Sequence, residues 1–231
     1  MIKKLKYIKY YSKVILKNWK GRKDSYSQHG EDKIIELLLP GGVNSFIDIG
    51  ANDGVLFSNT YKFAKNGARG LCIEPSPKSY IKLYLNHLPN WRVKTVNLAI
   101  SIKNSEVYLN EDGYEQVLSK VSLTRSNSSK VAKCINFDKL IAQYPRFKNI
   151  DLLSVDVEDH EYQVFCGLTD PHFSSKVIIL ESNLNKLDEL IKLNSLRNYI
   201  PICHNYLNII LKHKDENLVL PKHLPPNFER I

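Results

Sequence analysis

The chain has 231 residues, 43% of them hydrophobic and 25% charged, which suits one α/β domain with a well-buried core. Its net charge of +9 lies in residues 1–23, which hold eight lysines, Arg22 and no acidic residue, so residues 24–231 are neutral with 24 basic and 24 acidic side chains. A neutral body argues against a nucleic-acid enzyme with a basic binding face, and no apolar run approaches the roughly 18 residues of a membrane span.

The basic segment, residues 1–23, predicts an amphipathic helix. Such a helix would either contact an anionic membrane surface or pack its apolar face on its own domain or on a second subunit. The four cysteines show no CxxC pairing, which indicates reduced, buried thiols. We therefore expect a cytoplasmic protein, with peripheral contact at the inner membrane surface as one interpretation of residues 1–23. The basic face holds Lys3, Lys6, Lys9, Lys13, Lys17 and Lys20, and the apolar face holds Leu5, Ile8, Tyr11, Val14, Ile15 and Trp19.

From Tyr26 onward, strand and helix patterns alternate, which predicts a mainly parallel sheet with crossover helices. Polar, aperiodic residues 110–133 predict a surface excursion, and the proline-containing residues 215–231 an irregular tail, so the folded domain is assigned to residues 24–214. Strands are predicted at 45–49, 70–73, 93–100, 151–157, 177–180, 199–203 and 206–211, with 106–109 returning as a hairpin. Helices are predicted from about 30 to 38, from about 58, and around 80–84, 138–141, 162–165 and 184–191.

The sharpest local feature is the run FIDIGANDG at residues 46–54, in which an apolar strand leads into a glycine-bearing turn and then a helix. Gly50 and Gly54 are expected to let the backbone approach a ligand above the carboxyl ends of the strands. A dinucleotide site would need GxGxxG, but Asn52 replaces the second glycine. The carboxylate of Asp48 suits the amino group of S-adenosylmethionine and repels a pyrophosphate, although it could instead brace the loop.

Glu74 stands at the end of the second predicted strand, twenty residues after Gly54. An acidic side chain at this place can accept hydrogen bonds from both ribose hydroxyls of a nucleotide cofactor. The glycine turn alone would be compatible with an ordinary tight turn, and Glu74 is what favours a cofactor site.

Several ordered motifs together make the chain resemble the FkbM-type methyltransferases from Tyr26 to about Lys214. They are YSQHGED at 26–32, IDIGANDGVLFSNT at 47–60, CIEPSP at 72–77, NLAIS at 97–101, SVDVEDHEYQVFCG at 154–167 and IILES at 178–182. The resemblance implies a Rossmann-like class I methyltransferase with a seven-stranded, mostly parallel sheet and helices on both faces. It also implies methyl transfer from S-adenosylmethionine to a hydroxyl of a sugar, a glycan or a polyketide-type product. The cofactor residues that it implies, in addition to Asp48, Gly50, Asn52, Gly54 and Glu74, are Asp53, Asn59, Pro75, Asn97, Ala99 and Asp156.

The acidic run after the fourth strand is the expected place of catalysis, because removal of a hydroxyl proton needs a base. Asp156 or His160 is the predicted base, with Glu158 beside them, although His160 could equally cap a helix. Asp156 and Glu158 could also combine with Glu181 to hold Mg²⁺. Alternatively, Glu158 and Glu161 pair with lysines or with backbone N–H groups, and no metal ligand is assigned from the sequence.

The acceptor side of the site is expected to include Gln28, His29 and Asp32, which otherwise cap the first helix of the domain. One departure from the family motif is Asp159, where a glycine is usual, and it places the geometry of the acceptor site in question.

Two alternatives to an oxygen-directed methyltransferase remain at this point. One is an NAD-linked Rossmann oxidoreductase, disfavoured by Asp48 and Asn52. The other is a membrane- or partner-binding protein that retains the fold while Asp159 impairs catalysis.

Overall fold

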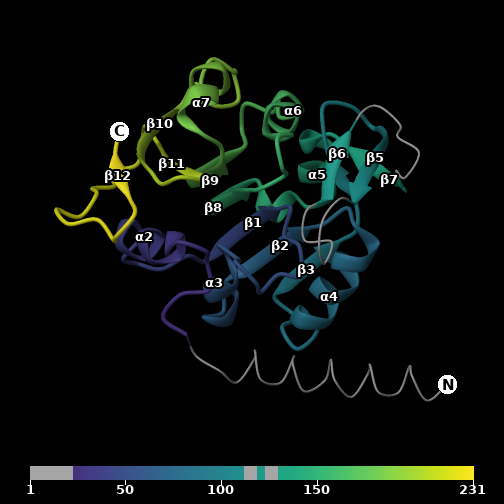
Figure 1. The fold of residues 1–231 in the computed structure, drawn as a ribbon, viewed down its shortest axis with the longest axis horizontal. Helices are drawn as coiled ribbons and strands as arrows, with labels where there is room; N and C mark the ends of the chain where they lie inside the picture. Colours follow the sequence, from purple (N-terminus) through teal and green to yellow (C-terminus); the bar gives the residue numbers. More distant parts are fainter. Residues whose placement is uncertain (1–22, 112–118, 123–129) are drawn as a thin grey trace.

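The computed structural model describes residues 23–111, 119–122 and 130–231, so the predicted N-terminal helix lies outside the described residues apart from Lys23. The main sheet has eight strands in the order β12-β10-β11-β9-β8-β1-β2-β3 (Figure 1). The β9-β8-β1-β2-β3 part is parallel, and β10, β11 and β12 add antiparallel pairs at one edge. The predicted Rossmann-like sheet is therefore confirmed, with eight strands in place of seven.

The bounds of the elements follow the apolar patterns of the sequence closely. The main sheet contains β1 (Ser45–Ile49), β2 (Arg69–Ile73), β3 (Val93–Val96), β8 (Asn149–Val155), β9 (Ser174–Glu181), β10 (Tyr199–His204), β11 (Asn208–His213) and β12 (Glu229–Arg230). The helices are α2 (Glu31–Leu38), α3 (Tyr61–Lys65), α4 (Pro77–His87), α5 (Phe137–Gln143), α6 (Glu161–Cys166) and α7 (Leu184–Leu190), with a 3₁₀ turn at Pro145–Phe147.

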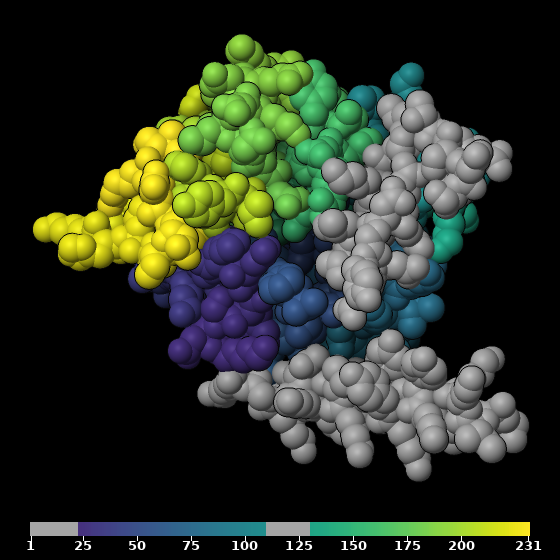
Figure 2. All heavy atoms as spheres, viewed as in Figure 1, coloured from purple at the N-terminus to yellow at the C-terminus, as the bar shows by residue number. Residues whose placement is uncertain are grey.

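Helices cover both faces of the main sheet because successive strand residues point to opposite sides. Phe46 of β1 packs in one core with residues of α2, α3 and α4, whereas its neighbour Ile47 packs in the other with residues of α5, α6 and α7. The tail after β11 joins the first of these cores through Phe228. In the space-filling view these C-terminal residues lie next to α2 (Figure 2).

A second sheet corrects two predictions. It contains β4 (Ala99–Ile100), β7 (Lys130–Ile135), β5 (Ser105–Glu111) and β6 (Ser119–Ser122), in that order. Residues 93–100 are thus two strands in different sheets, and β5 pairs with β6 and β7 rather than folding back on the preceding strand. Part of the region predicted as an excursion is strand, because Ala132 and Cys134 share a small core with Val107 and Leu109. The C-terminal tail also contributes the edge strand β12.

The chain order of the strands changes direction between β1 and β8. From β1 the chain proceeds outward to β2 and β3, and from β8 it proceeds the other way to β9. In open parallel sheets, ligands bind beyond the carboxyl ends of the strands at such a switch point. In the parts of the chain that the structure describes, no helix is long and apolar enough to cross a membrane.

Candidate active site

A cavity of about 360 Å³ opens beyond the carboxyl ends of β1, β2, β8 and β9, at the switch point of the sheet. Ten of its lining residues were predicted as site or candidate metal residues: Gln28, Asp48, Gly50, Asn52, Asn59, Glu74, Pro75, Asp156, Glu158 and Glu181. The remaining lining residues are Ala51, Leu56, Phe57, Ser58, Ser79, Ser154, Val157 and Leu207. The fold therefore brings residues from the two halves of the sequence around one hollow.

Asp48 is held at the floor of the cavity near the end of β1. Its Oδ2 atom accepts a hydrogen bond of 2.6 Å from the Thr60 hydroxyl, and only 5% of the residue is exposed. Burial raises the pKa of Asp48 to about 6, although the hydroxyls of Thr60 and Ser154 lower it in part. The carboxylate is thus poised to gain from a cationic ligand group, which would offset the cost of its desolvation.

The turn after β1 is fixed by backbone contacts with both neighbouring strands. The amides of Gly50 and Ala51 donate to the carbonyl oxygen of Ile73, and the amide of Asp156 donates to that of Ile49. Gly50 has φ +88°, and a Cβ atom there would lie 1.6 Å from the carbonyl oxygen of Asp156. Glycine is therefore required for the close approach of the β1 and β8 ends.

Gly54 and Asp53, both predicted as cofactor residues, make contacts within the loop and with α4. A Cβ atom on Gly54 would meet Leu83 and His87, so this glycine allows the turn to pack against α4. The Oδ1 atom of Asp53 accepts hydrogen bonds from the amides of Val55 and Leu56 at 2.9 and 2.8 Å, which closes the turn internally. Both residues shape the loop without lining the cavity.

Glu74 follows β2, and its side chain contacts the glycine turn that follows β1. Its Oε2 atom accepts from the amide of Asn52 at 2.9 Å and its Oε1 atom from the amide of Ser76 at 2.7 Å. Burial raises the pKa of Glu74 to about 7, and the two amides lower it in part. A carboxylate oxygen can accept more than one hydrogen bond, so both oxygens remain able to accept from ligand hydroxyls.

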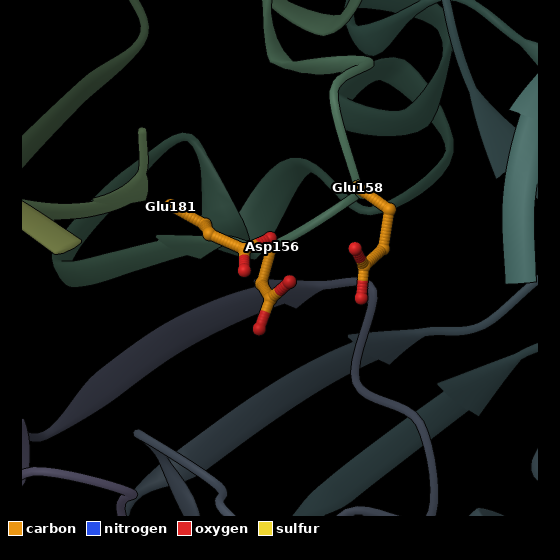
Figure 3. A group of neighbouring side chains, drawn as sticks. All are labelled: Asp156, Glu158 and Glu181. Atoms are coloured by element: carbon orange, nitrogen blue, oxygen red, sulfur yellow. The ribbon is translucent and has the colours of Figure 1, made fainter. Parts of the chain in front are cut away.

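Three carboxyl groups gather at the ends of β8 and β9, and Figure 3 shows the carboxyl group of Glu181 next to that of Asp156, with that of Glu158 to one side. One oxygen atom from each lies within 4.8 Å of the others. Burial raises the pKa of Asp156 to about 6, and burial and then a hydrogen bond with Asp156 raise that of Glu181 to about 9. At neutral pH, Glu181 is therefore protonated, and its carboxyl group donates a hydrogen bond to the Asp156 carboxylate. The spacing also matches what a divalent cation needs from three oxygen ligands.

His160, a predicted base, does not lie with these carboxyl groups. Its side chain is buried beneath the turn, with Nε2 2.9 Å from the Ser101 hydroxyl, and it does not line the cavity. Burial lowers the pKa of His160 to about 4, so the imidazole is neutral near pH 7. Its role is structural, because it joins the start of α6 to the segment that follows β4.

Four further predicted residues lie away from the cavity lining. Asn97 donates from Nδ2 to the carbonyl oxygens of Glu74 and Pro75, and so it braces the turn that carries Glu74. Ala99 is buried in the core of the second sheet. The amide of His29 donates to Glu31. The Asp32 carboxylate is fully buried and accepts from Ser25, Tyr26 and Ser27, so it holds residues 25–27 in place instead of facing an acceptor.

Two residues that line the cavity, Phe57 and Leu207, were not predicted as site residues. Phe57, which is 52% exposed and has φ +58°, forms an isolated parallel bridge with Ser27. Leu207, on the β10–β11 turn, reaches the cavity because the buried Glu31 carboxylate accepts from Asn205 and Asn208 at 2.7 and 2.8 Å. These contacts join residues more than 170 positions apart, and no local pattern could reveal them.

The backbone at Asp159 has the conformation that a glycine, expected there from the resembled motif, would adopt without strain. Glu158 and Asp159 have φ values of +54° and +73°, in the left-handed region that glycine adopts without strain. The Asp159 side chain points outward and forms an ion pair with Lys186. Asp159 therefore occupies a left-handed turn, and its side chain does not line the cavity.

Comparisons with known proteins agree with this geometry. A sequence model described as the methyltransferase FkbM domain matches residues 48–206, whereas curated protein sequences gave no match. Among solved structures, the putative methyltransferase yhhF from Escherichia coli is similar, with a TM-score of 0.50 and 15% identity over 86% of this chain and 96% of that one. The methyltransferase FkbM from Methylobacillus flagellatus KT is similar with a TM-score of 0.47 and 11% identity over 74% of this chain and 43% of that one. Since the family model covers well over half of the sequence, the chain belongs to the FkbM methyltransferase family.

Proposed function

We propose that this chain transfers a methyl group from S-adenosylmethionine to a hydroxyl oxygen of an uncharged, sugar-type acceptor. One observation carries the proposal: a single cavity contains both the Asp48–Glu74 pair, suited to a nucleoside with an amino-acid tail, and the Asp156 carboxylate, suited to remove a hydroxyl proton. Family membership supports the transfer reaction, and the chemistry of the cavity supports the cofactor and the type of acceptor.

The donor set fits S-adenosylmethionine, which when bound supplies a methyl group on a sulfonium centre. Glu74 would accept hydrogen bonds from the ribose hydroxyls, and Asp48 would bind the ammonium group of the amino-acid tail. NAD fits the same cavity poorly, because its pyrophosphate would face the carboxylates of Asp48, Glu74 and Asp156. Among the described residues that line the cavity, none is a lysine, an arginine or a histidine.

The same charge balance favours an uncharged acceptor. The lining includes five carboxyl groups, from Asp48, Glu74, Asp156, Glu158 and Glu181. A phosphate or carboxylate on the acceptor would be repelled by those that are ionised at neutral pH, such as Asp156, whereas sugar hydroxyls can donate hydrogen bonds to them. The exposed ring of Phe57 at the rim provides an apolar face of the kind on which a sugar ring packs.

Asp156 is the proposed base. Its pKa of about 6 leaves it mostly ionised at neutral pH, yet more basic than an ordinary aspartate. The protonated Glu181 beside it stabilises the charged form and fixes its orientation. Methyl transfer to oxygen is an in-line displacement, so the orientation of the acceptor hydroxyl toward Asp156 matters as much as its basicity.

The test is methyl transfer from labelled S-adenosylmethionine to matched acceptors, such as a neutral glycan and the same glycan bearing a uronic acid. We expect methyl ethers on the neutral acceptor and little product on the anionic one. Product on nitrogen, or preferential methylation of the anionic acceptor, would contradict the proposal. Cofactor binding with no turnover on any acceptor would favour instead a binding protein that retains the fold.

A further inference from the structure

A row of exposed apolar side chains runs along α4 and into the turn that follows it. Ile81, Tyr84, Leu88 and Trp91, here called the α4 stripe, are 59%, 48%, 58% and 85% exposed. We propose that the α4 stripe docks this protein on an anionic phospholipid surface.

The spacing of the stripe shows that it is one face of an amphipathic helix. Ile81, Tyr84 and Leu88 follow an i, i+3, i+7 pattern, which places them in line along the helix. The opposite side of α4 is anchored, because Leu83, Asn86 and His87 are buried. An aligned set of large exposed apolar side chains is unusual on a monomer and marks a surface that binds something.

The charge around the stripe favours an anionic partner. Residues 75–105 contain five cations, Lys78, Lys82, Arg92, Lys94 and Lys103, and no aspartate or glutamate. The Arg92 guanidinium lies 5.0 Å from the centre of the Trp91 ring. An exposed tryptophan bordered by basic side chains is typical of interfacial membrane contacts, where the ring sits at the headgroup level.

A basic hollow beside Trp91 also supports an anionic partner. Lys23, the first described residue, lines this hollow together with Trp91 and Arg92. This hollow is lined by five basic residues, Lys23, Lys33, Lys62, Lys65 and Arg92, and two acidic ones, Asp24 and Glu36. Residues 1–22 themselves contain seven lysines and Arg22.

Two other partners for the stripe are disfavoured by the same charges. Packing of residues 1–22 on the stripe would bring their cations close to Lys78, Lys82 and Arg92. A symmetric contact with a second copy would likewise oppose basic rims. An anionic bilayer complements both the stripe and the N-terminal segment, at about 1 kcal/mol for each basic residue near the surface.

Trp91 provides a direct probe, because the chain has two tryptophans, Trp19 and Trp91. In a full-length Trp19→Phe variant, Trp91 is the sole tryptophan. We expect its emission to shift to shorter wavelength when phosphatidylcholine vesicles containing phosphatidylglycerol are added, and to be quenched by brominated lipid. Pure phosphatidylcholine vesicles should leave it unchanged.

Matched variants separate the stripe from other effects. Leu88→Ser should weaken vesicle binding about tenfold, because it removes one apolar anchor. Val219→Ser, at a 75% exposed position in the C-terminal tail, should leave binding unchanged. Melting temperatures should match the wild type in both, since neither side chain is buried.

Three results would overturn the proposal. Vesicle binding that persists with no change in Trp91 emission and no effect of Leu88→Ser would assign it to residues 1–22 alone. A shift that grows with protein concentration in the absence of vesicles would indicate a second copy. Equal shifts of the Trp91 emission with neutral and anionic vesicles would show that binding does not depend on the negative charge of the lipid.

Discussion

The protonated carboxyl group of Glu181 donates a hydrogen bond to the Asp156 carboxylate at the ends of two adjacent parallel strands. The register of β8 and β9 places Val155 opposite Leu180, so the next residue on each strand carries one member of the pair into the cavity. The pKa values of about 6 for Asp156 and about 9 for Glu181 follow from burial and from this shared proton. The pair thus holds one negative charge at neutral pH.

Methyl transfer should depend on the ionised form of Asp156. We expect the rate to rise about tenfold per pH unit below the pKa of about 6 and to level off above it. Asp156→Asn should lower kcat by about 10²- to 10⁴-fold and leave S-adenosylhomocysteine binding within a few-fold. Asp159→Asn is the control, because that carboxylate lies outside the cavity, and its kcat should match the wild type. An unchanged rate in Asp156→Asn would assign the base elsewhere.

The Glu181 side chain should lower the free energy of unfolding at neutral pH. Its pKa is raised from 4.5 to about 9, so the folded state binds more protons than the unfolded state between these values, and stability falls as pH rises through that window. Glu181→Gln has no such dependence and can still donate to Asp156. Allowing for the partial exposure of this group, we expect it to raise the free energy of unfolding by about 1 kcal/mol at pH 7.5. Urea titrations at pH 4 and pH 7.5 check this, and a gain of equal size at both pH values would contradict the assignment.

The carboxyl cluster should not require Mg²⁺. A cation bound by Asp156, Glu158 and Glu181 would have to displace the proton that Glu181 holds, which weakens metal binding at neutral pH. We expect methyl transfer to be the same with EDTA and with added Mg²⁺. Activity that is lost with EDTA and restored by Mg²⁺ would show that the cluster binds a metal during the reaction.

Asp159 should carry backbone strain, because its φ is +73°. Asp159→Gly and Asp159→Ala both remove the ion pair with Lys186. The difference between their free energies of unfolding therefore reports the backbone strain alone. We expect the glycine variant to be more stable than the alanine variant by about 1 kcal/mol in thermal or urea unfolding. Equal stability of the two variants would mean that the turn relaxes out of the left-handed region.

The elements of the main sheet could be predicted because their signals are local. The run from Phe46 to Ile49 is apolar except for Asp48, and it leads directly into the turn with Gly50. The same local logic located Asp48 and Glu74, since a residue at the end of a parallel strand must lie at the ligand edge of the sheet.

The predictions that the structure does not support concern residues positioned by contacts between distant parts of the chain. The alternation of residues 93–100 predicted one strand, but the Asn97 side chain turns inward to bond the carbonyl oxygens of Glu74 and Pro75, and the chain changes sheets there. The direction of the His160 side chain depends on Ser101, 59 residues earlier, so adjacency to Asp156 in sequence did not place it in the cavity.

Glu74 offers the most direct test of the central claim, that this cavity binds S-adenosylmethionine. Titration calorimetry should show binding of S-adenosylhomocysteine and none of NAD to the wild type. Glu74→Gln should bind S-adenosylhomocysteine about 10- to 100-fold more weakly, since the amide is a poorer acceptor for the ribose hydroxyls. Glu161→Gln, at a buried glutamate with a similar pKa of about 7 that does not line the cavity, should bind it like the wild type. Unchanged affinity in Glu74→Gln, or tighter binding of NAD than of S-adenosylhomocysteine by the wild type, would contradict the account.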